Sequence, residues 1–216
     1  MIKALIVNFN RVDLPRKMAE WLAARNVCPV FVDNNSDYPP LLEYYKTCPF
    51  QVVRMDANYV DVVVWHKNVL PQLGIKGNYI LTDPDLDLTG IPDDFVEVLE
   101  EGLRRYPQYD KCGFSLEIND LPNQVTIDWE RQFWQTPLDP MYFHADIGTT
   151  FALYKAHYPS LSAIRTNRPY TCRHVPWYYD LIDQLPEDES YYYHTQAQEI
   201  RAHSNILDRK PGRWKV

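Results

Sequence analysis

Three aspartates alternate in the segment ILTDPDLD (80–87), directly after a short apolar run. Carboxylates gathered in one turn repel one another unless a cation or hydrogen-bond donors neutralise them. Mg²⁺ and Mn²⁺ bind through one or two carboxylates and complete their coordination with water and substrate phosphates. The pattern therefore predicts a divalent-metal site with Asp85 and Asp87 as ligands, or with Asp83 and Asp85 in the other register. The competing interpretation is that these aspartates only form a turn and cap a helix.

The patterning of the first half of the chain predicts which elements position these aspartates. Short β-rich runs alternate with stretches of helical periodicity. We expect strands at 3–9, 29–33, 50–55, 78–83 and 111–118, and helices at 13–25, 41–46, 59–73 and 92–106. This alternation predicts an α/β fold with a Rossmann-like, mainly parallel central sheet and helices on both faces. Ligands bind such sheets at the carboxyl ends of the strands, which is where the aspartates fall.

Length, charge and cysteine usage limit the function classes. The 216 residues fit one domain. A net charge of −7 argues against a nucleic-acid partner, because such proteins neutralise phosphates with cations. We expect no transmembrane segment, since no stretch approaches the ~18 apolar residues that a span needs. Four cysteines without a CxxC spacing favour reduced thiols and a cytoplasmic location.

The glycine pattern excludes two common phosphate-binding loops. The chain has neither GxxxxGK[ST] nor GxGxxG, so neither a P-loop enzyme nor a dinucleotide fold of the usual kind is expected. A phosphate held through a metal ion needs no such loop.

The polar segments after the predicted strands resemble the nucleotide-sugar site of GT-A fold glycosyltransferases. These segments are VNFNR (7–11), VDNNS (32–36), MDAN (55–58) and LTDPDLD (81–87). The similarity is to family-two-like sugar transferases of polysaccharide synthesis, in a small bacterial or viral branch, and DPDLD resembles their DxD motif. Later segments that also resemble this branch are FSLEINDLP (114–122), WERQFW (129–134), DIGTTFALY (146–154) and RHVPWY (173–178). The resemblance covers most of residues 1–180.

The resemblance implies a single GT-A domain over residues 1–216. Its nucleotide-sugar-binding half would be 1–118, and its acceptor and catalytic half 119–216. The implied activity is transfer of a sugar from a nucleotide-sugar, most simply a UDP-sugar, to an acceptor hydroxyl of a glycan. Mn²⁺ or Mg²⁺ would be the cofactor, and inversion at the anomeric carbon is the expected outcome.

The resemblance also assigns roles to donor-site residues. Those expected to line or contact the nucleotide are Asn8, Asn10, Arg11, Asp33, Asn58, Lys67, Asp85 and His174. Of these, the residues after the first strand would line the base and ribose pocket, and Asp33 would contact the base or ribose. His174 would face the diphosphate.

Metal and catalytic roles follow from the same resemblance. Asp85 and Asp87 would bind the metal, with His203, or His194, as a late metal or phosphate contact. A base is needed to take the proton of the acceptor hydroxyl. The two candidates for it are Asp146, just before GTTFALY, and Asp180, after HVPWYY. Three tryptophans could stack on sugar faces or pack in the core: Trp129, Trp134 and Trp177.

Three other interpretations stay open. Asp85-Leu-Asp87-Leu-Thr89 matches the DxDxT motif of haloacid-dehalogenase-type phosphatases, in which Asp85 would be the nucleophile. That motif follows the first strand of its fold, whereas here it follows about the fourth. A nucleotidyltransferase would need a glycine-rich N-terminal loop, which is missing. A carbohydrate- or nucleotide-binding module without turnover would use the same crevice.

Overall fold

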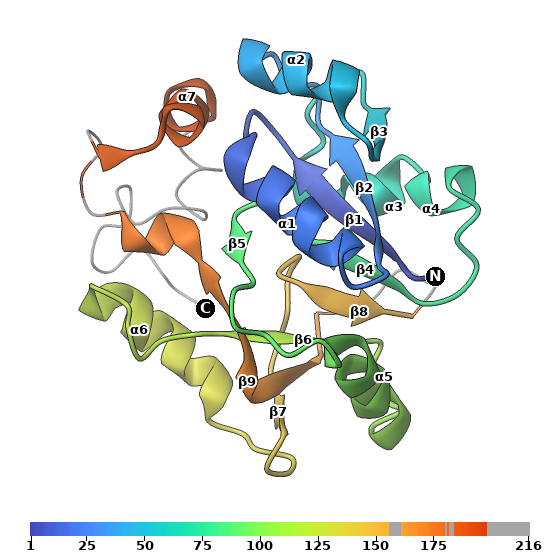
Figure 1. Cartoon of the computed structure of the whole chain (residues 1–216). Helices are drawn as coiled ribbons and strands as arrows, with labels where there is room; N and C mark the ends of the chain where they lie inside the picture. Colours follow the sequence, from blue (N-terminus) through green and yellow to red (C-terminus); the bar gives the residue numbers. More distant parts are fainter. Residues whose placement is uncertain (156–160, 180, 182–183, 198–216) are drawn as a thin grey trace.

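The computed structural model describes residues 1–155, 161–179, 181 and 184–197, and it shows one curled sheet with helices packed around it (Figure 1). The strands are β1 (Lys3–Asn8), β2 (Cys28–Asp33), β3 (Gln51–Arg54), β4 (Tyr79–Thr82), β5 (Leu86–Asp87), β6 (Lys111–Leu116), β7 (Tyr142–His144), β8 (Ala152–Tyr154) and β9 (Ile164–His174). The helices are α1 (Asp13–Ala23), α2 (Pro39–Thr47), α3 (Val63–His66), α4 (Val69–Gln72), α5 (Phe95–Arg105), α6 (Gln124–Arg131) and α7 (Glu187–Thr195). Short 3₁₀ turns are η1 (Val60–Val62), η2 (Gln132–Trp134) and η3 (Val175–Tyr178).

The strand order is β3-β2-β1-β4-β8-β6-β9-β5, with β7 paired to β9. The first four strands are parallel, as the alternation of strands and helices predicts, so the α/β class is confirmed. The predicted strand at 111–118 forms as β6, but it does not pair with β4. Antiparallel β8, from the second half of the chain, lies between them. The second half therefore completes the same sheet.

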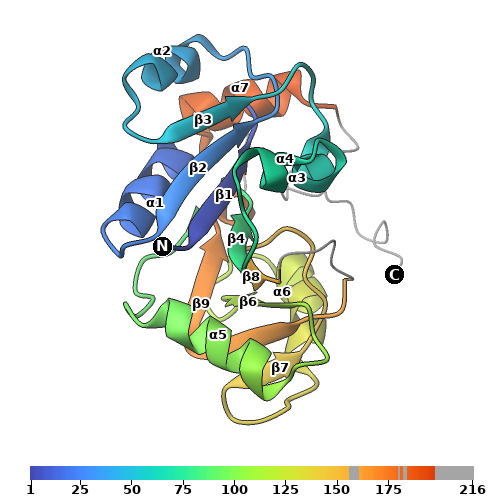
Figure 2. The same cartoon turned by 90° about the vertical axis from the view of Figure 1, so that its right-hand side faces the viewer.

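Alternating side chains on each strand face two separate cores. On β1, Ala4 and Ile6 pack in one cluster with α1 and α5, while Leu5 and Val7 pack in the other with α3 and α4. Figure 2 shows α1 on one side of the strands and α3 and α4 on the other. This period-two alternation of apolar residues on both faces is what a sheet covered on both sides requires.

The single helix predicted at 59–73 is wrong. The segment forms η1, α3 and α4, which are separate short turns. Asn68 has a φ of 53°, in the left-handed region, and ends the helical path between α3 and α4. The run of β-branched valines also lowers the helix propensity of this segment. The other predicted helices form, and α2 begins at Pro39, a residue suited to a first helical turn.

Helix α7 joins the far end of the described chain to the start of α1. The backbone N–H groups of Val12 and Asp13 both donate to Asp188 Oδ2 at 2.9 Å. The residue before α1, Val12, offers no capping side chain of its own, so Asp188 takes over this role from 175 residues away. This contact places α7 beside the carboxyl end of β1.

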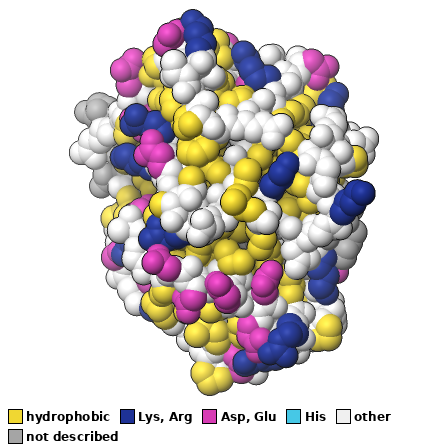
Figure 3. All heavy atoms as spheres, turned by 45° about the vertical axis from the view of Figure 1, so that its right-hand side comes forward, with side chains coloured by type: hydrophobic (Ala, Val, Ile, Leu, Met, Phe, Trp, Pro, Cys, Tyr) yellow, Lys and Arg dark blue, Asp and Glu magenta, His cyan; other side chains and the backbone are white. Residues whose placement is uncertain are grey.

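The surface mixes charge of both signs. On the face drawn in Figure 3, Lys and Arg side chains are interspersed with Asp and Glu, and hydrophobic side chains show between them. Among the described residues, no helix is both long and apolar enough to cross a membrane.

Candidate functional site

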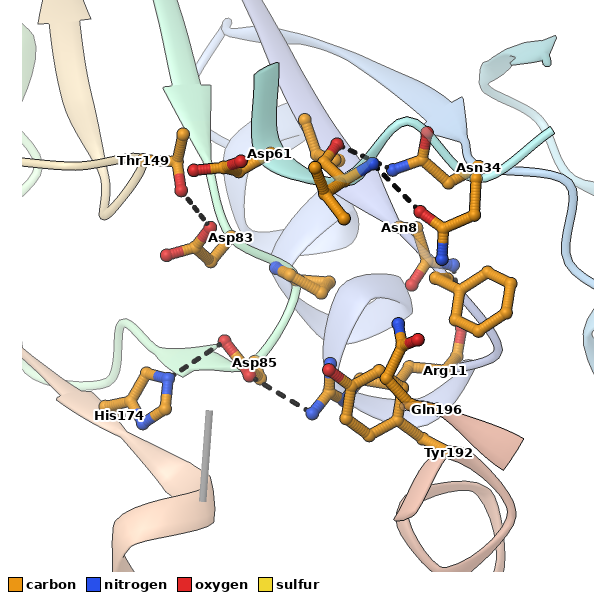
Figure 4. A pocket seen from close by; sticks show the side chains of 15 residues that line it. Asn8, Arg11, Asn34, Asp61, Asp83, Asp85, Thr149, His174, Tyr192 and Gln196 are labelled. Atoms are coloured by element: carbon orange, nitrogen blue, oxygen red, sulfur yellow. Dashed lines mark hydrogen bonds and ion pairs between the residues drawn. The ribbon is translucent and has the colours of Figure 1, made fainter. Parts of the chain in front are cut away.

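A cavity of about 580 Å³ lies at the carboxyl ends of β1, β2 and β4. Residues that end or follow these strands form one side of it, and later segments complete the wall (Figure 4). Its polar and charged lining includes Asn8, Arg11, Asn34, Asn58, Asp61, Asp83, Asp85, Thr149, His174 and Gln196. The cavity is at the sheet edge where the strand pattern predicts the ligand crevice.

Two aspartates of the DPD turn line this cavity. The hydroxyl of Thr149 donates to Asp83 Oδ1 at 2.6 Å. Burial, followed by the nearby charge of Asp85, raises the pKa of Asp83 to about 7. Asp61 adds to this rise, and in Figure 4 its carboxylate lies beside that of Asp83. A bound cation would relieve this crowding of negative charge.

A buried network of charges lies beside the aspartate pair. Arg11 Nη2 lies 3.3 Å from Asp85 Oδ2, and Arg11 Nε donates to Glu189 Oε1 at 2.5 Å. His174 Nε2 lies 3.4 Å from Asp85 Oδ1. The ring of Tyr192 stacks on the guanidinium at 3.6 Å. The two neighbouring carboxylates outweigh the cost of burial and raise the pKa of Arg11. The network thus joins β1, β4, β9 and α7 around one corner of the cavity.

Two asparagine amides hold a strained turn against the opposite corner. Asn34 Nδ2 donates to the carbonyl of Val60 at 2.9 Å, and its Oδ1 accepts from the N–H of Tyr59. Asn58 Oδ1 accepts from the N–H of Val60 at 2.9 Å. Val60 has a φ of 53°, an uncommon conformation for a β-branched residue. Such strain persists only where surrounding contacts enforce it, as these amides do.

Asn8 presents an acceptor to the cavity. Its Nδ2 donates to the carbonyl of Arg11 and to the hydroxyl of Tyr45. Asn8 is fully buried, and within the described part of the chain its Oδ1 has no hydrogen-bond partner. Since buried acceptors are nearly always paired, this oxygen is available to a ligand N–H or O–H.

Two residues expected in the nucleotide pocket hold the fold instead. Asn10 Oδ1 accepts from the N–H groups of Asp37 and Tyr38, and its Nδ2 donates to Asp37. Asp33 is fully buried and accepts from Ser36 and from Arg54 Nε. Neither residue is among those that line the cavity. Both stabilise the loop after β2, and Asn34 takes the place beside the cavity.

Three further candidates also lie away from the cavity lining. Lys67 Nζ contacts the Tyr59 hydroxyl at 3.1 Å and Asp56 at 3.5 Å. Asp87 Oδ1 accepts from the N–H of Thr89 and caps that turn. Asp146 is exposed, and its backbone carbonyl accepts from Arg165. Of the predicted aspartates within the described part of the chain, Asp83 and Asp85 line the cavity, and this pair is the earlier of the two registers.

Of the remaining candidates, two lie outside the described residues and four lie away from the cavity lining. Asp180 and His203 lie outside the described residues, so their roles stay predictions. His194 is exposed and contacts the Ser190 carbonyl. The three tryptophans pack elsewhere: Trp177 and Trp129 belong to the core beside α1, and Trp134 contacts Phe143.

Lining residues that the sequence did not single out include Asp61, Thr149, Tyr192 and Gln196. Thr149 lies in the DIGTTFALY segment and Tyr192 in a tyrosine run, but neither carries a local signal for a site. Long-range contacts bring two of them to the cavity: Thr149 donates to Asp83, 66 positions away, and Tyr192 stacks on Arg11.

The two carboxylates suit a hard divalent ion whose remaining ligands are water and phosphate oxygens. Within the described ranges, no group of three or more His, Cys, Asp or Glu side chains is arranged to hold a metal. Two carboxylates, Asp83 and Asp85, nonetheless line one cavity, and burial together with the charge of Asp85 raises the pKa of Asp83. Mg²⁺ typically takes one or two protein carboxylates and fills its octahedron with water and phosphate oxygens.

Comparison with known proteins adds no relative. No family model matches this chain, and no curated protein matches it.

Proposed function

We propose that this chain is a metal-dependent glycosyltransferase of the GT-A type. It would move a sugar from a nucleotide-sugar, first of all a UDP-sugar, to an acceptor hydroxyl of a glycan. The observation that carries the proposal is the pair of carboxylates, Asp83 and Asp85, at the end of β4 in a cavity of about 580 Å³. A cavity of this size suits a ligand of nucleotide-sugar dimensions.

The lining divides into a part suited to the nucleoside and a part suited to the diphosphate. Near the ends of β1 and β2, apolar Val7, Phe9 and Val60 lie with the acceptor oxygen of Asn8. A flat base with an N–H group would meet both requirements. The DPD turn, with Arg11 and His174, forms the charged part.

Asp83 and Asp85 would hold Mg²⁺ or Mn²⁺. When bound there, such an ion supplies Lewis-acid stabilisation of the negative charge that develops on the departing nucleoside diphosphate. Thr149 fixes the orientation of the Asp83 carboxylate by donating to its Oδ1. The base that takes the acceptor proton would be Asp146 or Asp180, as the sequence resemblance implies.

The geometry disfavours a phosphatase that uses Asp85 as its nucleophile. Asp87, the second aspartate of the DxDxT pattern, is not among the residues lining the cavity.

A panel of nucleotide-sugars tests the proposal. Thermal unfolding is measured with UDP-, GDP- and dTDP-sugars, each with Mn²⁺, with Mg²⁺ and with EDTA. One donor should raise the melting temperature by about 5–10 °C at 100 times its Kd, and only with metal. Release of the nucleoside diphosphate on adding acceptor sugars then reports turnover.

Each other result has a defined meaning. A shift without diphosphate release under all acceptors would indicate a binding module. No donor shift with either metal would contradict the proposal. Hydrolysis of p-nitrophenyl phosphate that depends on Asp85 would favour the phosphatase.

A further inference from the structure

Arg11 is a buried cation with one unused donor. The residue is 3% exposed, and its Nε donates to Glu189. Its Nη2 makes only a 3.3 Å ion-pair contact with Asp85 and has no hydrogen bond within the part of the chain described. Buried donors are nearly always hydrogen-bonded, so the retention of this one points to a partner.

The location of this guanidinium supplies a second observation. Arg11 lines the cavity, and Figure 4 shows its guanidinium between Asp85 and the ring of Tyr192. The planar fork of a guanidinium matches two oxygens of a phosphate better than any other side chain. A ligand with a phosphate group would satisfy the unused Nη2.

We infer that Arg11 binds a phosphate group of the ligand and that helix α7 holds its guanidinium in position to do so. In this structure Arg11 pairs with Asp85. A cation held by Asp83 and Asp85 would take over the neutralisation of Asp85 and leave Nη2 for a phosphate oxygen. The inference rests on the proposed function only in identifying the phosphate-bearing molecule as a nucleotide-sugar.

Helix α7 is the element that makes this arrangement rigid. Glu189 and Tyr192 are three positions apart and therefore share one face of the helix. One fixes the Nε edge of the guanidinium and the other covers its flat face at 3.6 Å. Asp188, the neighbour of Glu189, anchors the helix on the start of α1. A segment from the acceptor half thus builds part of the donor site.

Inorganic pyrophosphate is the probe, titrated calorimetrically into the full chain with Mg²⁺. Arg11→Gln should weaken binding about 10-fold or more, because a charge-assisted contact is lost. Glu189→Gln should instead tighten binding about 3–5-fold, because it removes a negative charge beside the anion and keeps a hydrogen-bond acceptor for Nε. The matched control is Arg16→Gln, which removes the same charge from an exposed pair with Asp13 and should leave binding unchanged.

A purely structural role for Arg11 gives different results. Glu189→Gln would then lower stability without tightening pyrophosphate binding, and that outcome overturns the inference even if Arg11→Gln fails to fold. Absence of pyrophosphate binding by the wild type also overturns it, while a metal-dependent UDP-sugar shift would leave the proposed function standing. Pyrophosphate binding that depends on Arg11, in a protein with no donor turnover, would support the phosphate site and remove the sugar-transfer proposal.

Discussion

Asp83→Asn should make the protein more stable at neutral pH and at the same time remove its metal-dependent donor binding. Burial and Asp85 raise the pKa of Asp83 to about 7 from an ordinary value of 3.8. The ionised carboxylate is therefore unfavourable in the folded protein, whereas an amide carries no charge and can still accept from Thr149. Loss of one metal ligand should reduce turnover by about 10²–10³-fold, as for loss of other groups that stabilise transition-state charge.

The stability effect has a defined dependence on pH. Between about pH 4 and pH 7 the folded state keeps a proton on Asp83 that the unfolded chain has released. The free energy of unfolding of the wild type therefore falls as pH rises through this window, and levels off above it. The difference between variant and wild type should be near zero at pH 4 and reach about 2 kcal/mol at pH 8. This is about half of the value for the full shift, since solvent in the cavity screens the pair.

Denaturant unfolding from pH 4 to pH 8 measures this difference. The control is Asp87→Asn, an identical change at an aspartate that caps Thr89 instead of lining the cavity. It should show no gain that grows with pH, and it should keep the metal-dependent donor shift. If Asp87→Asn loses that shift and Asp83→Asn keeps it, the metal ligands are those of the later register. A constant difference at every pH would contradict the raised pKa.

Gly113→Ala should strongly destabilise the protein. A Cβ at Gly113 would lie 2.4 Å from the carbonyl oxygen of Phe151 and 2.6 Å from Ala152 Cβ. Backbone atoms of a central strand pair cannot rotate away, so β6 and β8 would have to separate. We expect a loss of about 3 kcal/mol, which lowers the melting temperature by about 6–12 °C for a chain of this size.

The same change should reach the cavity. The added methyl would also press on Ile147 Cδ1, 2.8 Å away, and Ile147 lies two residues before Thr149. Donor binding should weaken along with stability. The matched control is Gly77→Ala, where no atom lies within 4 Å of the new methyl, and stability should change by less than about 0.5 kcal/mol. Equal melting temperatures for the two variants would show that the contact at Gly113 is not so tight.

Local rules explain why much of the sheet follows from the sequence. Apolar runs at 3–9, 29–33 and 78–83 read as strands because both faces of a covered sheet are apolar, and the intervening helices make them parallel. The polar turn after the fourth strand then necessarily lies at the carboxyl edge. The prediction of one helix at 59–73 is wrong because Asn68 adopts a left-handed conformation that interrupts the helix, and the composition of the segment does not reveal this.

The acidic turn at the carboxyl edge of an α/β sheet follows from the sequence, because strand periodicity and crossover handedness depend on local features of the chain. Tertiary structure decided which acids line the cavity. Asp83 and Asp85 do so, whereas the carboxylate of Asp33 accepts hydrogen bonds from Ser36 and Arg54. It also decided that Arg11 is held by α7, since a contact across 178 residues depends on packing of the whole chain and on no pattern near either partner.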